Sequence, residues 1–271
     1  MATLPNPLPA LTADPTGRSA GLQLPPGSLV DTTEEGVWHE PLLWYADEPA
    51  TPDAWTALLP ARMSAGLLPV LIHGGPDDHW PEEWDLSPET TSYPGDHDAE
   101  EVLAEFWEEY AEDELGEDSA IEPFGPEWPG LAPTLAAEAD PDVRAAEVAA
   151  ELVDKEGWMH GARAALVPAR RSADIPAAIG WSGPLNYEDD VARLCSVLRS
   201  WEDRFGIRVV GLGFDQLTVS VASPPTTLSE AEAVAAEHFA FCPDNLADYD
   251  SLRAYAARDV LDQHVWSFWW D

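Results

Sequence analysis

Residues 186–221, NYEDDVARLCSVLRSWEDRFGIRVVGLGFDQLTVSV, decide the fold of the C-terminal half. Steps of four and three residues, typical of one apolar helix face, separate Tyr187, Val191, Leu194, Leu198, Trp201 and Phe205. We expect Asn186 to cap this helix and Gly206 to end it. Residues 207–212 are mostly apolar and residues 217–221 alternate, so the stretch predicts a helix followed by a β-hairpin.

Elements on both sides extend this pattern. We expect strands at residues 164–167 and 177–181 before the helix, and a last strand at 266–270. Ser229 and Glu232 have capping-box spacing and predict the start of another helix. Counted from Ala177, the order is strand, helix, strand, strand, helix, strand, which is the ferredoxin-like pattern. The sequence therefore predicts an α+β fold with a ferredoxin-like C-terminal domain and a smaller acidic α+β N-terminal region.

The N-terminal half divides into segments of different composition. Residues 1–28 are rich in Pro, Gly, Thr and Ser and predict a flexible leader, and residues 29–157 form the acidic α+β region. Strands are expected at 38–45 and 67–72, and Asp98 and Glu101 predict the start of a helix. Residues 111–140 lack periodicity and predict a mobile connector, after which Asp140 and Pro141 start a helix to about residue 153. Residues 158–271 are the second expected domain.

Negative charge is concentrated in the first half of the chain. The whole sequence carries 51 Asp and Glu against 13 Lys and Arg, a net charge of −38. Residues 1–160 hold 35 of the acidic residues and only four basic ones, and residues 77–127 hold 20 acidic residues without a Lys or Arg. Such a surface repels nucleic acid and anionic membranes, so we expect neither as a partner.

The cellular compartment is predicted from two kinds of segment that the sequence lacks, a signal peptide and a membrane-spanning run. The N-terminal residues do not combine a cationic start with an apolar block, and no run of about 18 apolar residues is present. Cys195 and Cys242 have no CxxC spacing and no histidines at zinc-ligand spacing, so we expect two buried thiols. These features predict a cytoplasmic protein.

Four C-terminal motifs carry a family resemblance: AAIGWSG at 177–183, LRSWEDRFG at 198–206, EHFAFCPD at 237–244 and WSFWWD at 266–271. Together they resemble the bacterial family called domain of unknown function 4253, over about residues 162–271. Upstream, residues 66–72 and 99–107 are similar to what often precedes that domain. The resemblance implies kinship but no activity, cofactor or catalytic residue.

Two acidic clusters with histidine lie at the ends of one predicted loop. Asp77 and Asp78 precede His79, and His97 lies between Asp96 and Asp98. Imidazole and carboxylate ligands suit a divalent metal that activates water for hydrolysis. The spacing matches neither HExxH nor an EF-hand loop, so a solvated acidic loop is the competing interpretation.

Two further sets have both a functional and a structural interpretation. His73, Gly74 and Gly75 follow a predicted strand and form either an oxyanion-binding turn or a plain turn; GxSxG, P-loop and GxGxxG motifs are absent. A catalytic Cys-His-Asp set would use Cys242 and His238, but His238 shares a helical face with Val234 and fits a core position better. Trp269 and Trp270 point to opposite sides of a strand, so one of them is expected in the core.

The sequence favours a noncatalytic interaction protein whose acidic surface recognises a basic protein partner, as an inhibitor, an immunity-type protein or a nucleic-acid mimic would. The expected partner-binding residues are Glu105, Glu108, Glu109, Glu112, Asp113, Glu114, Trp270 and Asp271. No cofactor is expected in this interpretation. The alternative is a metal-dependent hydrolase that holds a divalent metal with His79, Asp96, His97 and Asp98.

Overall fold

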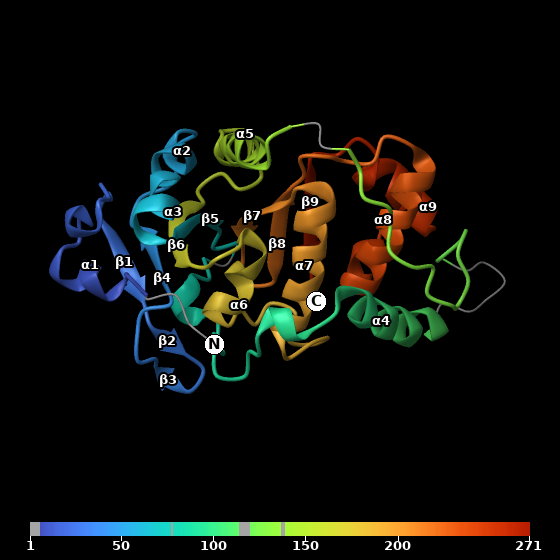
Figure 1. Cartoon of the computed structure of the whole chain (residues 1–271), viewed down its shortest axis with the longest axis horizontal. Helices are drawn as coiled ribbons and strands as arrows, with labels where there is room; N and C mark the ends of the chain where they lie inside the picture. Colours follow the sequence, from blue (N-terminus) through green and yellow to red (C-terminus); the bar gives the residue numbers. More distant parts are fainter. Residues whose placement is uncertain (1–5, 77, 114–119, 137–138) are drawn as a thin grey trace.

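The protein is built around one mixed β-sheet, seen in a computed structural model that describes residues 6–76, 78–113, 120–136 and 139–271 (Figure 1). The strand order is β1-β4-β6-β5-β7-β8-β9. The strands are β1 Gly27–Val30, β4 Leu43–Ala46, β5 Leu67–Ile72, β6 Arg163–Pro168, β7 Arg208–Leu212, β8 Gln216–Ser220 and β9 Val265–Trp269. A separate small hairpin pairs β2 (Thr32–Thr33) with β3 (Gly36–Val37). An α+β fold is therefore confirmed.

Both halves of the chain contribute to this sheet. β5 from the N-terminal half lies between β6 and β7 from the C-terminal half, antiparallel to β6 and parallel to β7. β7, β8 and β9 then pair antiparallel in chain order. In a ferredoxin-like sheet the first strand lies between the third and the fourth, so the expected C-terminal arrangement is not the one observed. Among its described residues, the acidic N-terminal region has no sheet to itself beyond the small β2–β3 hairpin.

The element at residues 177–181, predicted as a strand, is a helix instead. α6 spans Ile175–Ile179 and ends at Gly180, which has a left-handed backbone with φ of 63°. Pro176 fits the first helical turn and glycine fits the end of the helix, so local signals outweighed the apolar run. A Cβ atom at Gly180 would lie 2.1 Å from the backbone nitrogen of Pro88, so this position also requires glycine for close packing.

The long helix of the C-terminal half is confirmed, with a different start. α7 spans Val191–Phe205, ends at Gly206 as predicted, and is capped by Asp190, whose carboxylate accepts from the amide of Ala192. Asn186 instead donates from its side chain to the carbonyl of Asp271.

The predicted capping box of the next helix lies two residues earlier. Thr227 and Glu230 form it at the start of α8, which spans Leu228–Phe241. The predicted pair, Ser229 and Glu232, lies inside the helix. Both pairs place a hydroxyl residue three positions before a glutamate, so the spacing alone did not show which pair caps the helix.

Alternation along the strands places apolar side chains on both sheet faces. Along β5, Leu68, Val70 and Ile72 join the main core, whereas Leu67 and Leu71 face the opposite side. The main core lies under α4 (Ala99–Asp113), α6, α7 and α8. The other face is covered by α2 (Ala54–Leu58), α3 (Pro60–Ala65) and α5 (Pro141–Val153). Because both faces are covered there, the central strands β4, β5, β6 and β7 are buried on both sides.

Residues 8–24, within the segment predicted as a flexible leader, pack on that second face. They contain α1 (Pro9–Ala13) and the short η1 (Arg18–Ala20), at the left end of Figure 1. Leu8, Leu11, Leu22 and Leu24 are buried in one cluster with Trp44 of β4. The Pro and Gly content of these residues thus belongs to a folded segment with many turns, in which four leucines supply the burial.

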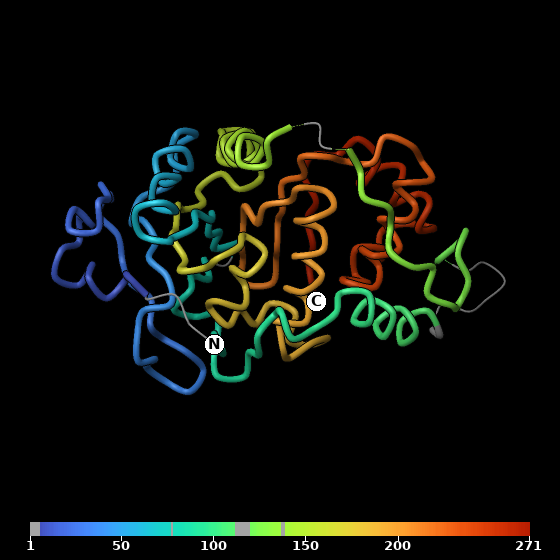
Figure 2. The backbone as a smooth tube through the Cα atoms, in the orientation of Figure 1, coloured from blue at the N-terminus to red at the C-terminus, as the bar shows by residue number. Residues whose placement is uncertain are grey.

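α4 spans Ala99–Asp113, and the carboxylate of Asp98 accepts from the amides of Glu100 and Glu101, which confirms the predicted cap. Residues 120–136 then run past α8 toward α5 along the right of Figure 2. Part of the expected mobile connector is therefore packed, since Ile121 and Ala132 are buried in the main core.

The remaining short elements lie in the connections. They are η2 (Pro81–Glu83), η3 (Pro94–Asp96), η4 (Ser172–Asp174), η5 (Pro243–Leu246), α9 (Leu252–Tyr255) and the π-helical turn η6 (Ala256–Val260). Among the helices of the described residues, none is both long enough and apolar enough to cross a membrane.

Candidate functional site

α4 presents two different faces. Its apolar face packs into the main core through Val102, Leu103, Phe106 and Trp107. Its outer face exposes the carboxylates of Glu100, Glu101, Glu105, Glu108 and Glu109. Glu114 and the side chains of Glu112 and Asp113, also expected at this surface, lie outside the described residues. We call the five described carboxylates the α4 acidic face.

One cation neutralises part of this face. Arg193 of α7 places Nη2 2.6 Å from Oε2 of Glu105, and its Nε lies 3.2 Å from Oε2 of Glu188. In the described part of the chain, no ion pair involves the other four carboxylates of the α4 acidic face. The face therefore keeps most of its charge available to a partner.

A hollow of about 480 Å³ adjoins the C-terminal end of α4. We call it the tyrosine hollow, because its walls include Tyr110, Tyr187, Tyr249 and Phe239, with the carboxylate of Asp244. The hydroxyl of Tyr187 donates to Oδ1 of Asp244 at 2.7 Å, and the rings of Tyr110 and Tyr187 meet edge to face at 6.0 Å. Aromatic rings beside a carboxylate suit a cationic group.

Burial and nearby carboxylates raise the pKa values of two tyrosines in the hollow. The pKa of the Tyr110 hydroxyl is raised first by burial and then by the negative charge of Glu109. The pKa of Tyr187 is raised by burial and by its hydrogen bond to Asp244. Burial is the larger cause of both shifts, and the neighbouring carboxylates raise both pKa values further. The carboxylates of Glu109 and Asp244 thus place negative charge beside the hollow as well as on the α4 acidic face.

The two C-terminal residues expected at the partner surface differ from each other. Trp270 is buried, with its ring edge-on to Trp181 at 5.6 Å, so its expected role as an exposed partner anchor is wrong. Trp269 is the exposed tryptophan, because the side chains of β9 alternate between core and solvent. Asp271 is exposed and donates its amide to Asp244 at the edge of the hollow.

The predicted metal ligands are engaged separately. The ring of His79 packs edge-on against Phe214 at 5.5 Å. Nε2 of His97 lies 2.6 Å from Oγ of Ser92, and Asp98 caps α4. Across the described residues, no three His, Cys, Asp or Glu side chains converge to hold a metal ion. His79, Asp96, His97 and Asp98 are thus not brought together as one metal site.

Trp84 and Leu86 explain why the two ends of that loop stay apart. Both side chains are fully buried in the main core, in the middle of the loop that joins His79 to Asp96. The indole nitrogen of Trp84 also donates to the carbonyl of His79. The middle of the loop is therefore anchored in the core, which holds its two polar ends in separate positions.

His238 is a core residue, as the structural interpretation of the sequence expected. Asn245 donates to the hydroxyl of Tyr255 at 3.1 Å, which leaves the Tyr255 proton for Nδ1 of His238 at 2.9 Å. Nε2 then carries the ring proton and has no hydrogen-bond partner among the described residues. The imidazole ring packs edge-on against aromatic rings, the nearest of them Trp266 at 4.6 Å between ring centroids. Burial lowers the pKa of His238 to about 3, so the ring is neutral at physiological pH.

Cys242 does not form a catalytic pair with His238. Its thiol donates to the carbonyl of Trp269 at 3.0 Å, and burial raises the pKa of the thiol. Cys195 is also buried with a raised pKa. Neither thiol has the lowered pKa of a nucleophilic cysteine.

A buried ion pair of α7 and α8 was not predicted from the sequence. Glu237 is 0% exposed, and its two oxygens lie 2.7 and 2.5 Å from the Nη atoms of Arg204. The same carboxylate accepts from the indole nitrogen of Trp201 at 2.7 Å and from the amide of Ala132 at 2.6 Å. We call this set the Glu237 cluster. It connects the 120–136 segment to the C-terminal helices and has a structural role.

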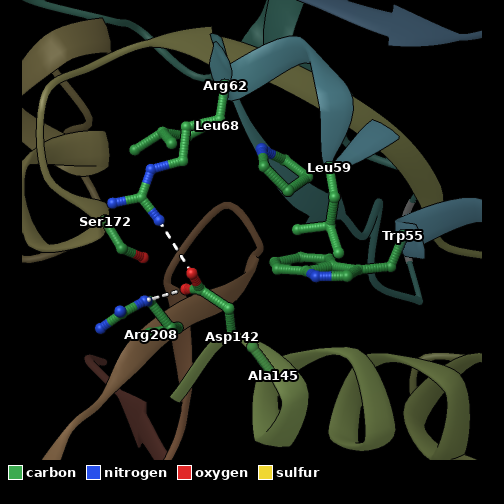
Figure 3. A pocket seen from close by; sticks show the side chains of 9 residues that line it. Trp55, Leu59, Arg62, Leu68, Asp142, Ala145, Ser172 and Arg208 are labelled. Carbon is green, nitrogen blue, oxygen red and sulfur yellow. Dashed lines mark hydrogen bonds and ion pairs between the residues drawn. The ribbon is translucent and has the colours of Figure 1, made fainter. Parts of the chain in front are cut away.

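A second ion-pair network lies on the opposite face of the sheet, where it joins two helices to a strand. In Figure 3 the carboxylate of Asp142, at the start of α5, lies between two arginines. Its oxygens are 2.9 Å from Nη1 of Arg62 and 2.7 Å from Nε of Arg208. The hollow beside them, also lined by Trp55, has a volume of about 30 Å³, which is room for about one water molecule. This network joins α3, α5 and β7 and is too small to be a ligand site.

Comparison with known proteins finds a match for the C-terminal half of the chain only. No curated protein and no solved structure matches the chain. One family model matches residues 163–271, from the first residue of β6 to the C-terminus. The matched part contains α6, α7, the β7–β8 hairpin, α8 and β9, whereas β5 and α4 lie outside it. Residues 163–271 of this chain therefore match the model of the family described as Domain of unknown function (DUF4253), the family that the four C-terminal motifs resemble.

Proposed function

We propose that this chain is a noncatalytic interaction protein whose α4 acidic face and adjoining tyrosine hollow bind a basic protein partner. The observation that supports this function best is the position of the exposed carboxylates on one helix face beside an aromatic hollow that contains Asp244. An inhibitor, an immunity-type protein or a nucleic-acid mimic uses a surface of this kind.

Electrostatics gives the physical argument. Carboxylates fixed on one face attract a basic partner over about 8–10 Å at physiological salt and increase its association rate. Rim charges contribute mainly to this steering, whereas groups in a hollow contribute to the lifetime of the complex. We therefore expect a lysine or arginine of the partner to enter the tyrosine hollow, where ring faces and Asp244 stabilise a cation.

A salt-dependent pull-down tests the proposal. The chain is used as bait in lysate of its source organism at low and high salt, and captured proteins are identified by mass spectrometry. A variant that carries Glu101→Gln, Glu108→Gln and Glu109→Gln neutralises part of the α4 acidic face. Because exposed ion pairs contribute about 0.2–1 kcal/mol each, the three changes should weaken the partner's Kd by about tenfold.

The matched control is Glu35→Gln with Glu40→Gln. Both residues are exposed near the β2–β3 hairpin, at the opposite end of the molecule from α4 in Figure 1. The control should bind like the wild type. A partner that is acidic, insensitive to salt or equally weakened by the control would contradict the proposal.

The metal-dependent hydrolase alternative gains no comparable support, because His79, His97 and Asp98 are held in separate interactions and no metal-ligand cluster forms among the described residues. No second function is proposed for them.

A further inference from the structure

The sheet of the described residues contains one parallel strand pair, β5 with β7. Their carboxyl ends lie at the same edge, where His73 follows β5 and its amide donates to Leu212, the last residue of β7. In sheets with parallel strands, ligands commonly bind beyond such ends, in the loops that follow the strands. The His73-Gly74-Gly75 turn, which the sequence left open between two interpretations, lies at this position.

A hollow of about 380 Å³ lies at this edge, within the range of small-molecule sites. Its walls combine the turn after β5 with the turn between β7 and β8. The side chains that matter are His73, His79, Phe214, Asp215, Gln216 and Trp269. We call it the β5–β7 hollow. It shares no wall residue with the tyrosine hollow.

Exposed aromatic side chains gather around this hollow. Phe214 is 41% exposed and Trp269 is 42% exposed, although both line it. Trp158, 47% exposed, packs its ring edge-on against His73 at 6.0 Å. Leaving large apolar rings in water is unfavourable, and such groups around a concave site mark a binding surface.

The hollow is held in position before any ligand binds. The indole nitrogen of Trp269 donates to Oδ2 of Asp215 at 3.0 Å, and the backbone carbonyl of Asp215 accepts from the amide of Trp270. Trp181 also donates to the carbonyl of Gly213 in the same turn. A ring fixed by its own hydrogen bond loses little conformational entropy when a ligand stacks on it.

The polar groups of the walls indicate the charge of the ligand. Burial lowers the pKa of His73, so its ring is neutral and offers one donor and one acceptor. Gln216 offers both kinds of group, and the carboxylate of Asp215 accepts. No Lys or Arg is found among the described wall residues, so an anion would meet a carboxylate without a compensating cation.

We propose that the β5–β7 hollow binds an uncharged small molecule whose ring has a face able to stack on aromatic side chains and hydrogen-bond donors at its edge. The ring stacks on Phe214 and Trp269, and the edge groups bind Asp215, Gln216 and the ring of His73. A nucleoside and a saccharide share this chemistry. The site is independent of the α4 acidic face and of the proposed partner.

NMR titration of the full chain tests this site with three probes. Adenosine and methyl glucoside represent the two uncharged sources, and AMP adds a phosphate to the first. We expect at least one uncharged probe to shift the Trp269 indole N–H and the His73 ring signals with a Kd in the millimolar range or below. AMP should bind at least about fivefold more weakly than adenosine if adenosine is the probe that binds.

Variants separate stacking at this site from adventitious binding. Phe214→Ala and Trp269→Ala each remove an exposed ring and should raise the Kd at least about tenfold. Tyr93→Ala, which removes a ring of similar exposure that does not line the hollow, should leave the Kd unchanged. The variant with three neutralised α4 glutamates should also bind like the wild type, whatever happens to its partner binding.

Saturable binding of either uncharged probe with these variant effects supports the site and identifies the ring class. Any of three results would overturn the proposal. The first is no chemical-shift change with either uncharged probe at about 10 mM, a concentration that would detect even a weak complex. The second is a Kd that Phe214→Ala does not change, and the third is AMP binding as tightly as adenosine.

Discussion

Replacing Glu237 with glutamine should destabilise the protein strongly, although the change removes no volume. Each oxygen of this carboxylate faces two N–H donors: Oε1 accepts from Arg204 and Ala132, and Oε2 accepts from Arg204 and Trp201. A glutamine amide has one NH₂ group, and in either orientation that group would face two donors. The variant therefore loses two hydrogen bonds and leaves the Arg204 charge without its counter-ion.

The magnitude follows from burial. Breaking a buried ion pair by removing one partner costs about 3–5 kcal/mol, because the remaining charge is uncompensated. For a domain of this size that corresponds to a decrease of roughly 6–20 °C in Tm. Urea denaturation followed by tryptophan fluorescence measures the loss, and hydrogen exchange at the amide of Ala132 should accelerate, because that amide donates to Glu237.

Glu105→Gln is the matched control. Its ion pair with Arg193 spans 2.6 Å, against 2.5 Å for Glu237 with Arg204, but the Glu105 side chain is 66% exposed and that of Glu237 is 0% exposed. An exposed pair contributes about 0–1 kcal/mol. Equal losses in the two variants, or a loss below 1 kcal/mol for Glu237→Gln, would refute the reasoning that burial makes the Glu237 cluster important.

Three further predictions concern single positions. The pKa of His238 is about 3 in the folded protein and 6.5 in the unfolded chain, so the unfolded chain binds the proton first as the pH falls. The free energy of unfolding should therefore decrease by about 1.4 kcal/mol per pH unit as the pH is lowered from about 6 to 4. His238→Phe should remove that part of the slope in denaturation curves measured across this range. Cys195 and Cys242 should react with Ellman's reagent only as fast as the protein unfolds; rapid native labelling would contradict their burial and raised pKa. Gly180→Ala should cost more than about 2 kcal/mol, because the new Cβ lies 2.1 Å from a backbone nitrogen, whereas Gly66→Ala, at a similar φ but in open space, should cost only about 1–2 kcal/mol.

Local signals predicted several elements well. β5 and α7 follow from apolar spacing, and Asp98 and Asp140 cap α4 and α5 as expected. These features depend on residues within a few positions of each other in the chain. Errors occurred where two local signals competed, as at residues 177–181, where Pro176 and Gly180 favour a helix and the apolar run favours a strand.

The candidate sites depended much more on distant contacts. The α4 acidic face was predictable because its carboxylates share one helix. The tyrosine hollow was not, since Tyr110, Tyr187 and Tyr249 come from three separate segments. The β5–β7 hollow likewise needed the parallel pairing of two strands 135 or more residues apart in the chain. The exposure of Trp269 instead of Trp270 depended on the register of β9 against β8.

By itself, the sequence determined the strongly acidic character of this protein, its main helices and hairpin, and the family resemblance of its C-terminal half. Charge, apolar period and helix caps are local properties, so they can be read without knowing which segments meet. Only the tertiary structure decided that one sheet joins both halves, that the N-terminal leucines pack against it, and that Glu237 is buried beside Arg204. Strand order and the burial of a charge depend on contacts between residues far apart in the chain, and no local pattern encodes them.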